Sequence, residues 1–295
     1  MVADDTMLIS TLYKGVHYDL IKPYKQDIIK NHKAFAEFNS MDYRLYGGEI
    51  PYRYDLGTKT FTEFNMTYDI LNLFPGIGKL YSILAAQEDY PRKASYIFVD
   101  FDSVFMNNVQ LNSNNTLISG QDIYKHKLTV SCRQNPYLYD TSFLYYYCMY
   151  TGMTFNDIKH LRYRYNSGLF IIANGVITRE LVDDYVNFCI DIYKKKTHYS
   201  LYGNLEEISD THAMTLPYSE VHANDKEHGL FHPTDEVFFQ WLQIKIKSED
   251  EHIAELNDSW NMLNPSPEDT DFKDVYHVHC IDKTLIPVML EKSNI

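Results

Sequence analysis

Two carboxylates, Asp100 and Asp102, follow directly on the apolar run Ala94–Val99 (ASYIFV). On an extended backbone, residues two positions apart point to the same side, so both carboxylates can bind one divalent cation. A cation with open coordination positions can stabilise the charge that develops on the phosphate oxygens when a diphosphate leaves. The Asp-x-Asp pattern also occurs by chance in solvated loops. Its place at the carboxyl end of an apolar strand, where open α/β sheets bind ligands, favours the metal site.

Strands and helices alternate in the chain before these carboxylates. Short apolar runs predict strands over Met7–Tyr13 and Asp42–Tyr46, and apolar residues at helical spacing predict helices over Tyr18–Met41 and Gly78–Glu88. Pro23 interrupts the first of these helices near its start. Strand and helix alternation of this kind predicts a largely parallel sheet with helices on its faces.

Regular patterns return further along the chain, after an Asn-rich and aromatic stretch with no clear periodicity. They predict two strands, Tyr165–Asn174 and Asp274–Ile281, and two helices, Thr178–Lys194 and Thr234–Gln243. A polar stretch, His198–His232, is expected to form a flap over the site. No internal repeat or Gly/Ser linker divides the chain, so we expect a single domain over residues 1–295.

Composition narrows the class of protein. The chain has 295 residues and a net charge of −13, which disfavours a broad phosphate-contacting surface for nucleic acid. Its four cysteines are far apart and show no paired spacing for zinc or a disulfide framework. No apolar run is long enough to span a membrane, and the N-terminus does not resemble a signal peptide. These features predict a soluble, cytoplasmic protein.

The pattern resembles the GT-A glycosyltransferase fold, and within it the families related to glycogenin and the bacterial lipooligosaccharide galactosyltransferases. In those families a strand near the N-terminus supplies the nucleotide pocket, which here implies Ser10, Thr11 and Tyr13. A basic residue on the helix before the Asp-x-Asp strand contacts the donor, and Lys79 lies at that place. The families usually have Arg there.

A second match is the segment Tyr165–Phe170 (YNSGLF), which is similar to the Phe-Asn-Ser-Gly strand start of many GT-A enzymes. The resemblance implies that Asn166, Ser167 and Gly168 contact the donor sugar. Asn and Ser offer hydrogen bonds to sugar hydroxyls, and Gly allows close approach of the backbone. A simple turn is the alternative, since Asn, Ser and Gly favour turns.

A third match is the acidic pair Asp235 and Glu236, which resembles the Asp-Gln or Asp-Glu pair beneath the reactive sugar. The resemblance implies a catalytic role, as the acceptor-binding carboxylate or, in an inverting enzyme, as the general base. Acidic residues in a first helical turn also occur simply because they compensate the helix dipole.

The C-terminal segment Tyr276–Lys283 (YHVHCIDK) provides the fourth match. In the related families a C-terminal His completes the metal site and a following Lys holds the diphosphate. His277 and Lys283 reproduce the six-residue offset of the family, and His279 lies on the same strand face and could serve instead. The glycine and the Pro-Trp that usually accompany this pattern are missing.

Taken together, the resemblance implies an α/β protein of GT-A type, with a mixed, mostly parallel sheet. Residues 1–108 would bind the nucleotide sugar and residues 109–295 the acceptor. The implied activity is sugar transfer from a nucleotide-diphosphate sugar, a UDP-sugar by resemblance, to a glycan, lipid or small-molecule acceptor. The implied metal is Mn²⁺ or Mg²⁺, bound by Asp100, Asp102 and His277 or His279.

Three alternatives remain at this point. An apolar strand ending in Asp-x-Asp also begins the haloacid-dehalogenase-type phosphotransferases, with Asp100 as nucleophile and Asp102 as acid or base. That pattern normally lies on the first strand of its fold, whereas two strand and helix units precede it here. A sugar- or nucleotide-binding protein without catalysis is a second alternative, and a glycosyltransferase acting on a modified nucleobase is a third. The net charge of −13 makes nucleic acid the less favoured acceptor.

Overall fold

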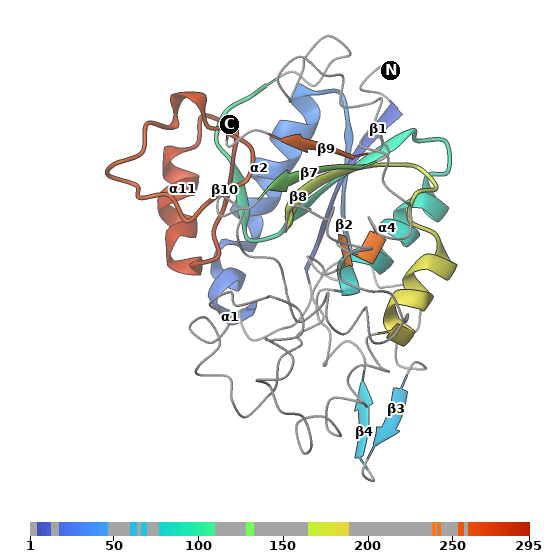
Figure 1. Ribbon diagram of the computed structural model, residues 1–295. Helices are drawn as coiled ribbons and strands as arrows, with labels where there is room; N and C mark the ends of the chain where they lie inside the picture. The colour runs from blue at the N-terminus through green and yellow to red at the C-terminus, as the bar shows by residue number, and fades with distance from the viewer. Residues whose placement is uncertain are drawn as a thin grey trace, which may run out of the picture.

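The centre of the protein is a six-stranded sheet (Figure 1). The computed structural model describes residues 5–12, 18–46, 60–63, 66–69, 77–109, 128–132, 165–188, 238–239, 241–242, 253–256 and 259–295. In sheet order the strands are β2 (Asp42–Tyr46), β1 (Thr6–Thr11), β5 (Ser95–Asp100), β8 (Tyr165–Ala173), β7 (Leu128–Cys132) and β9 (Ile253–Leu256). Strand β8 is antiparallel to both neighbours and all other pairs are parallel. The predicted mixed, mostly parallel sheet is therefore confirmed.

Helices flank this sheet on both sides (Figure 1). The elements are α1 (Tyr18–Ile21), the 3-10 turn η2 (Lys22–Tyr24), α2 (Lys25–Phe38), α4 (Ile77–Asp89) and a helix at residues 179–188. The predicted helix over Tyr18–Met41 is thus three consecutive pieces. Pro23 lies in the 3-10 turn between the two α-helices, where its missing N–H prevents a continuous α-helix.

Alternation along β5 sends its side chains to two different layers. Ile97 and Val99 belong to the hydrophobic core shared with α2 and α11 (Ile286–Lys292). Phe98 points to the other face, where it stacks on Phe170 at 5.0 Å between ring centroids. Because side chains alternate along a strand, Asp100 shares the face of Phe98, which is the face that α4 covers.

A second sheet joins the chain after Asp102 to the C-terminal region. It contains β10 (Met262–Leu263), β11 (His277–His279) and β6 (Ser103–Phe105) in that order, with β11 antiparallel to β6. The 3-10 turns η6 (Phe272–Asp274) and η7 (Lys283–Leu285) flank β11. A separate hairpin pairs β3 (Thr60–Glu63) with β4 (Met66–Asp69).

The last predicted strand, Asp274–Ile281, is longer than the observed β11, and the prediction of a strand at its first residues was wrong. Asp274 ends the turn η6. The Asn107 amide donates to the carbonyl oxygens of Phe272 and Val275 at 2.6 and 2.7 Å, which holds this segment in a turn. The strand pairing with β6 covers the three residues His277–His279.

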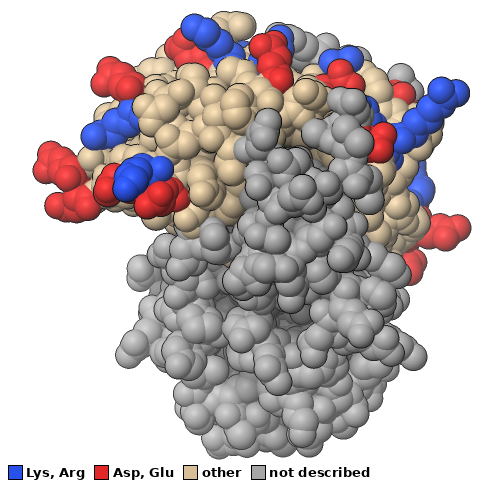
Figure 2. Space-filling model, turned by 90° about the horizontal axis from the view of Figure 1, so that it is seen from above, with Lys and Arg blue, Asp and Glu red and all other residues tan. Residues whose placement is uncertain are grey.

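The described surface carries both signs of charge. In the view of Figure 2, acidic and basic side chains are interspersed around the rim of the described part of this face. Among the described helices, none combines the length and the apolarity that crossing a lipid bilayer requires.

Candidate metal centre

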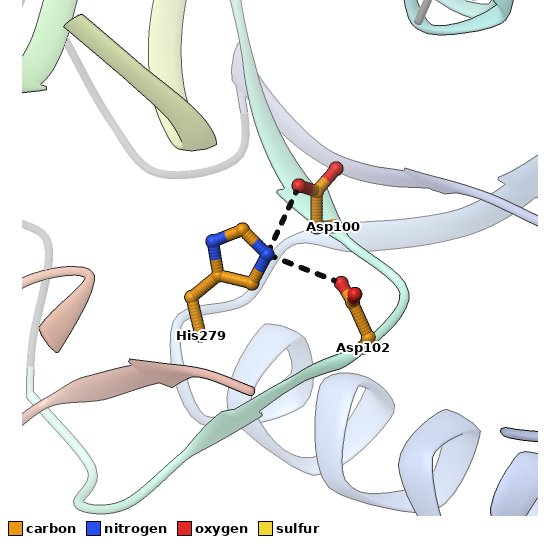
Figure 3. A group of neighbouring side chains, drawn as sticks. All are labelled: Asp100, Asp102 and His279. Atoms are coloured by element: carbon orange, nitrogen blue, oxygen red, sulfur yellow. Dashed lines mark ion pairs between the residues drawn. The ribbon is translucent and has the colours of Figure 1, made fainter. Parts of the chain in front are cut away.

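Three side chains from two distant parts of the chain converge on one point (Figure 3). The His279 ring points at both carboxylates, with Nε2 at 3.4 Å from an oxygen of Asp100 and 3.4 Å from an oxygen of Asp102. All three side chains are mostly buried, with 10 to 15% of each exposed. One ligand atom from each lies within 4.8 Å of the others, a spacing that a single metal ion can bridge.

Strand pairing explains why these residues meet. Asp100 is the last residue of β5, and Asp102 directly precedes β6. In the antiparallel pair of β11 and β6, His279 lies opposite Ser103, the residue next to Asp102. The backbone N–H of Cys280 donates to the carbonyl oxygen of Asp102 at 3.0 Å and extends this register.

Two lysines neutralise the carboxylates. The Lys79 ammonium on α4 lies 2.6 and 2.8 Å from the two oxygens of Asp100 and also donates to the Ser167 hydroxyl at 3.1 Å. The Lys283 ammonium donates to Asp102 and to the carbonyl of Cys280. Both lysine side chains are less than one tenth exposed. Buried ions require such partners, since an unpaired charge in the interior is strongly destabilising.

The charges in this group shift the pKa values of Asp102 and His279. Burial acts to raise the pKa of Asp102, but the charges and hydrogen bonds of His279 and Lys283 outweigh it and hold this pKa well below its usual range. Burial acts to lower the pKa of His279, but the neighbouring carboxylates, Asp102 before Asp100, raise it overall. The site therefore stabilises positive charge beside the two carboxylates.

Asn166 connects this group to β8. Its side-chain oxygen accepts hydrogen bonds from the backbone N–H of Gly168 at 2.8 Å and from the Asn261 amide at 2.5 Å. The same oxygen lies 3.3 Å from Nδ1 of His279. Asn166 is 2% exposed. The structure thus turns its carbonyl toward His279, a contact that the sequence did not predict.

Gly168 is the point of closest approach in this network. A Cβ built on it would lie 2.6 Å from the side-chain oxygen of Asn261, 2.8 Å from that of Asn166, and nearer still to Nδ1 of His279. The sequence-based prediction gave this glycine close approach to a sugar. In the described structure, the space that its missing side chain leaves is filled by His279 and the two asparagines.

An irregularity in β8 gives these residues their positions. Along β7, Val130 pairs with Phe170, but the next residue, Ser131, pairs with Asn166 in place of Leu169. The register between β7 and β8 is therefore irregular at this point, while Leu169 still pairs with Val99 of β5. Bulges commonly redirect side chains next to active sites.

His277 lies outside the group of three. It is fully buried, its ring is 5.0 Å from that of Phe105, and neither ring nitrogen has a hydrogen-bond partner among the described residues. Burial is the main reason that its pKa lies well below the usual value, followed by the charges of His279 and His32. The structure places His279, rather than His277, beside the carboxylates.

The residues predicted to form the nucleotide pocket are engaged within the protein. Ser10 shares a 2.7 Å hydrogen bond with the Tyr43 hydroxyl, and Thr11 donates to Ser82 at 2.6 Å. Both are buried at the end of β1 beside β5. Three further predicted features, Tyr13, the pair Asp235 and Glu236, and the flap His198–His232, lie outside the described residues.

The ligand atoms of Asp100, Asp102 and His279 suit a divalent cation. Carboxylates suit Mg²⁺ and Mn²⁺, whereas imidazole favours transition ions, so Mn²⁺ satisfies both kinds of ligand. The contact of His279 Nδ1 with Asn166 leaves Nε2 to face Asp100 and Asp102. An imidazole that binds metal through one nitrogen commonly donates from the other.

The fold of the chain is similar to that of solved structures. The chain matches the crystal structure of a glycosyltransferase involved in glycosylation of the major capsid of PBCV-1, at 9% identity and TM-score 0.50, over 97% of this chain and 98% of the other. Mouse xyloside xylosyltransferase 1 (13% identity, TM-score 0.42, 95% and 98% covered) and the galactosyltransferase LgtC with donor and acceptor sugar analogues (10%, 0.39, 98% and 96%) are weaker matches. The fold assignment rests on the first of these.

Comparisons of sequence alone found nothing. No family model matches the chain, and no curated protein does. The structural match to the PBCV-1 capsid glycosyltransferase shows that the protein has a glycosyltransferase fold, as the sequence predicted. That fold removes the main support for the phosphotransferase alternative, which required the Asp-x-Asp pattern on a different fold.

Proposed function

We propose that the protein is a metal-dependent glycosyltransferase that uses a nucleotide-diphosphate sugar, with a UDP-sugar as donor. The observation that carries this proposal is the convergence of Asp100, Asp102 and His279, within 4.8 Å of one another, at the carboxyl end of β5. On open α/β sheets this edge is where ligands bind.

Asp100, Asp102 and His279 would hold Mn²⁺ or Mg²⁺. When bound, the ion supplies positive charge that stabilises the leaving diphosphate. Lys79 and Lys283 are already placed at the two carboxylates. In the proposed complex their ammonium groups would turn part of their interaction to the diphosphate oxygens, since charge-assisted hydrogen bonds to phosphate are strong.

The remaining predicted residues complete the proposal. Ser10, Thr11 and Tyr13 would line the nucleotide pocket, and Ser167 and Gly168 would border the donor sugar. Asp235 or Glu236 would bind the acceptor or remove its proton. A glycan, a lipid or a small hydroxyl compound is the proposed acceptor class, and the residues 109–295 would shape its site.

A thermal-shift screen tests the donor class. UDP-, GDP- and CDP-sugars are each added with and without Mn²⁺ to the wild type and to Asp102→Asn, with Asp27→Asn as a matched control at an exposed helical position. We expect a UDP-sugar to raise Tm only with metal, in the wild type and the control but not in Asp102→Asn. Equal shifts with and without metal would reject metal dependence, and no shift with any nucleotide sugar would reject the donor class.

A further inference from the structure

We infer that Asn261, acting through Asn166, is a positioning residue that fixes the His279 ring with Nδ1 as a donor and Nε2 turned toward Asp100 and Asp102. This inference rests on the proposed function for its consequence, the presentation of Nε2 to a cation. Its geometric basis is independent of any ligand.

One hydrogen-bond donor in this network has a fixed role. The backbone N–H of Gly168 can only donate, so the Asn166 side-chain atom that lies 2.8 Å from it must be the carbonyl oxygen. This contact identifies which way the Asn166 amide is turned. The amide of Asn261 donates to the same oxygen at 2.5 Å and favours the same orientation.

The fixed oxygen then determines the histidine. Nδ1 of His279 lies 3.3 Å from the Asn166 oxygen, and an oxygen that only accepts requires Nδ1 to carry the proton. In the neutral ring the lone pair is then on Nε2. That nitrogen is the one 3.4 Å from both Asp100 and Asp102. The hydrogen bond on one ring nitrogen decides which nitrogen can bind metal.

Asn261 itself is held in an unusual backbone conformation. Its φ is +64°, in the left-handed region that side chains other than Gly, Asn and Asp rarely adopt. The residue is 6% exposed and follows the buried Trp260. The backbone conformation and the burial together direct the Asn261 amide toward Asn166. A substitution that tests the role of this amide must therefore tolerate the same positive φ.

Asn261→Gly removes the amide while allowing the same φ, so it separates the hydrogen bond from backbone strain. Asn264→Gly is the matched control. Asn264 is also in the left-handed region, at φ +41°, but its side chain accepts from the backbone N–H of Asp282 instead. Thermal unfolding of each variant establishes that it is folded before binding is compared.

The readout is electron spin-echo modulation of Mn²⁺ bound together with UDP, which detects the ¹⁴N of a coordinated imidazole. We expect wild type and Asn264→Gly to show ¹⁴N coupling. In Asn261→Gly the coupling should weaken or disappear, and the affinity for Mn²⁺ with UDP should fall roughly 10- to 100-fold. A purely structural role would lower Tm without changing the nitrogen coupling of the bound ion.

Substitutions of Asn166 provide a second, independent test. Asn166→Asp keeps an acceptor for Nδ1 and should retain the ¹⁴N coupling, whereas Asn166→Ala removes the acceptor and should lose it. Full coupling and wild-type affinity in both Asn261→Gly and Asn166→Ala would overturn the inference and leave the proposed function intact. Mn²⁺ with UDP bound to wild type without any ¹⁴N coupling would instead remove His279 from the proposed metal site, and the inference with it.

Discussion

Substituting Gly168 by alanine should disable the candidate metal centre without unfolding the protein. The added Cβ would lie 2.6 Å from the Asn261 oxygen, whereas ordinary van der Waals contacts begin at about 3.4 Å, so a displacement of about 0.8 Å (3.4 − 2.6) is required. The His279 ring is closer still and must move further. A misplacement of about 1 Å in a catalytic site can cost roughly 100-fold in rate.

Isothermal titration of Mn²⁺ with UDP, alongside thermal unfolding, measures this effect. We expect binding by Gly168→Ala to be weakened by one to two orders of magnitude, roughly the range seen for lost supporting contacts. Gly175→Ala is the control. Gly175 has φ +80°, so alanine costs about 1 kcal/mol of backbone strain, but no atom lies within 4 Å of the added Cβ. A folded Gly168→Ala that binds Mn²⁺ and UDP like the wild type would refute the steric reasoning.

Two further predictions concern charge. The substitution Lys283→Met removes the ammonium that is paired with Asp102, so it should strengthen binding of Mn²⁺ alone by about 5- to 150-fold, or 1–3 kcal/mol. The same substitution should weaken binding of UDP. Separate titrations of Mn²⁺ and of UDP measure both effects, and weaker binding of Mn²⁺ alone would contradict the prediction. Burial, opposed by its bond to the Ser103 carbonyl, lowers the pKa of His32 to about 4. The unfolded chain therefore takes up this proton first, and the contribution of His32 to stability should be complete above pH 6.5 and fall by about 1.4 kcal/mol per pH unit between pH 6.5 and 4. Urea unfolding of wild type and His32→Gln over this range measures the difference, and a pH-independent difference would exclude the role of His32.

Only part of the order of elements could be predicted from periodicity, because the short strands β3, β4, β6, β7, β9 and β10 were not predicted. Apolar runs gave Asp42–Tyr46 with the observed bounds and Ala94–Val99 within one residue of β5. The two carboxylates could be associated with the end of a strand because Asp-x-Asp follows that run directly. These features depend on local sequence, where side-chain alternation and helical spacing are visible.

The choice between the two histidines could not be predicted. His277 and His279 share one strand face, and the six-residue offset to Lys283 favoured His277. Pairing with β6 places His279 opposite Ser103, beside Asp102, and His277 opposite Phe105. Register between two short strands far apart in the sequence leaves no local signal.

The contacts of Asn166 with His279 and Asn261 could not be predicted either. Asn166 was expected to contact a sugar, since Asn-Ser-Gly resembles a donor-binding strand start. Its orientation follows from the irregular pairing of β7 with β8 and from the left-handed backbone of Asn261. Asn is a residue type that tolerates the left-handed conformation found at Asn261. Its hydrogen-bond partner Asn166 lies 95 residues earlier, so the contact is visible only in the folded chain.

Titration of Mn²⁺ into the protein in the presence of saturating UDP tests whether Asp100, Asp102 and His279 bind the cation. We expect saturable Mn²⁺ binding in the wild type that is abolished when Asp100 and Asp102 are both replaced by Asn and is strongly weakened in His279→Ala. Mn²⁺ binding of wild-type affinity in the folded double variant would contradict it, because the cation would then be held by residues other than the group on which the proposed function rests.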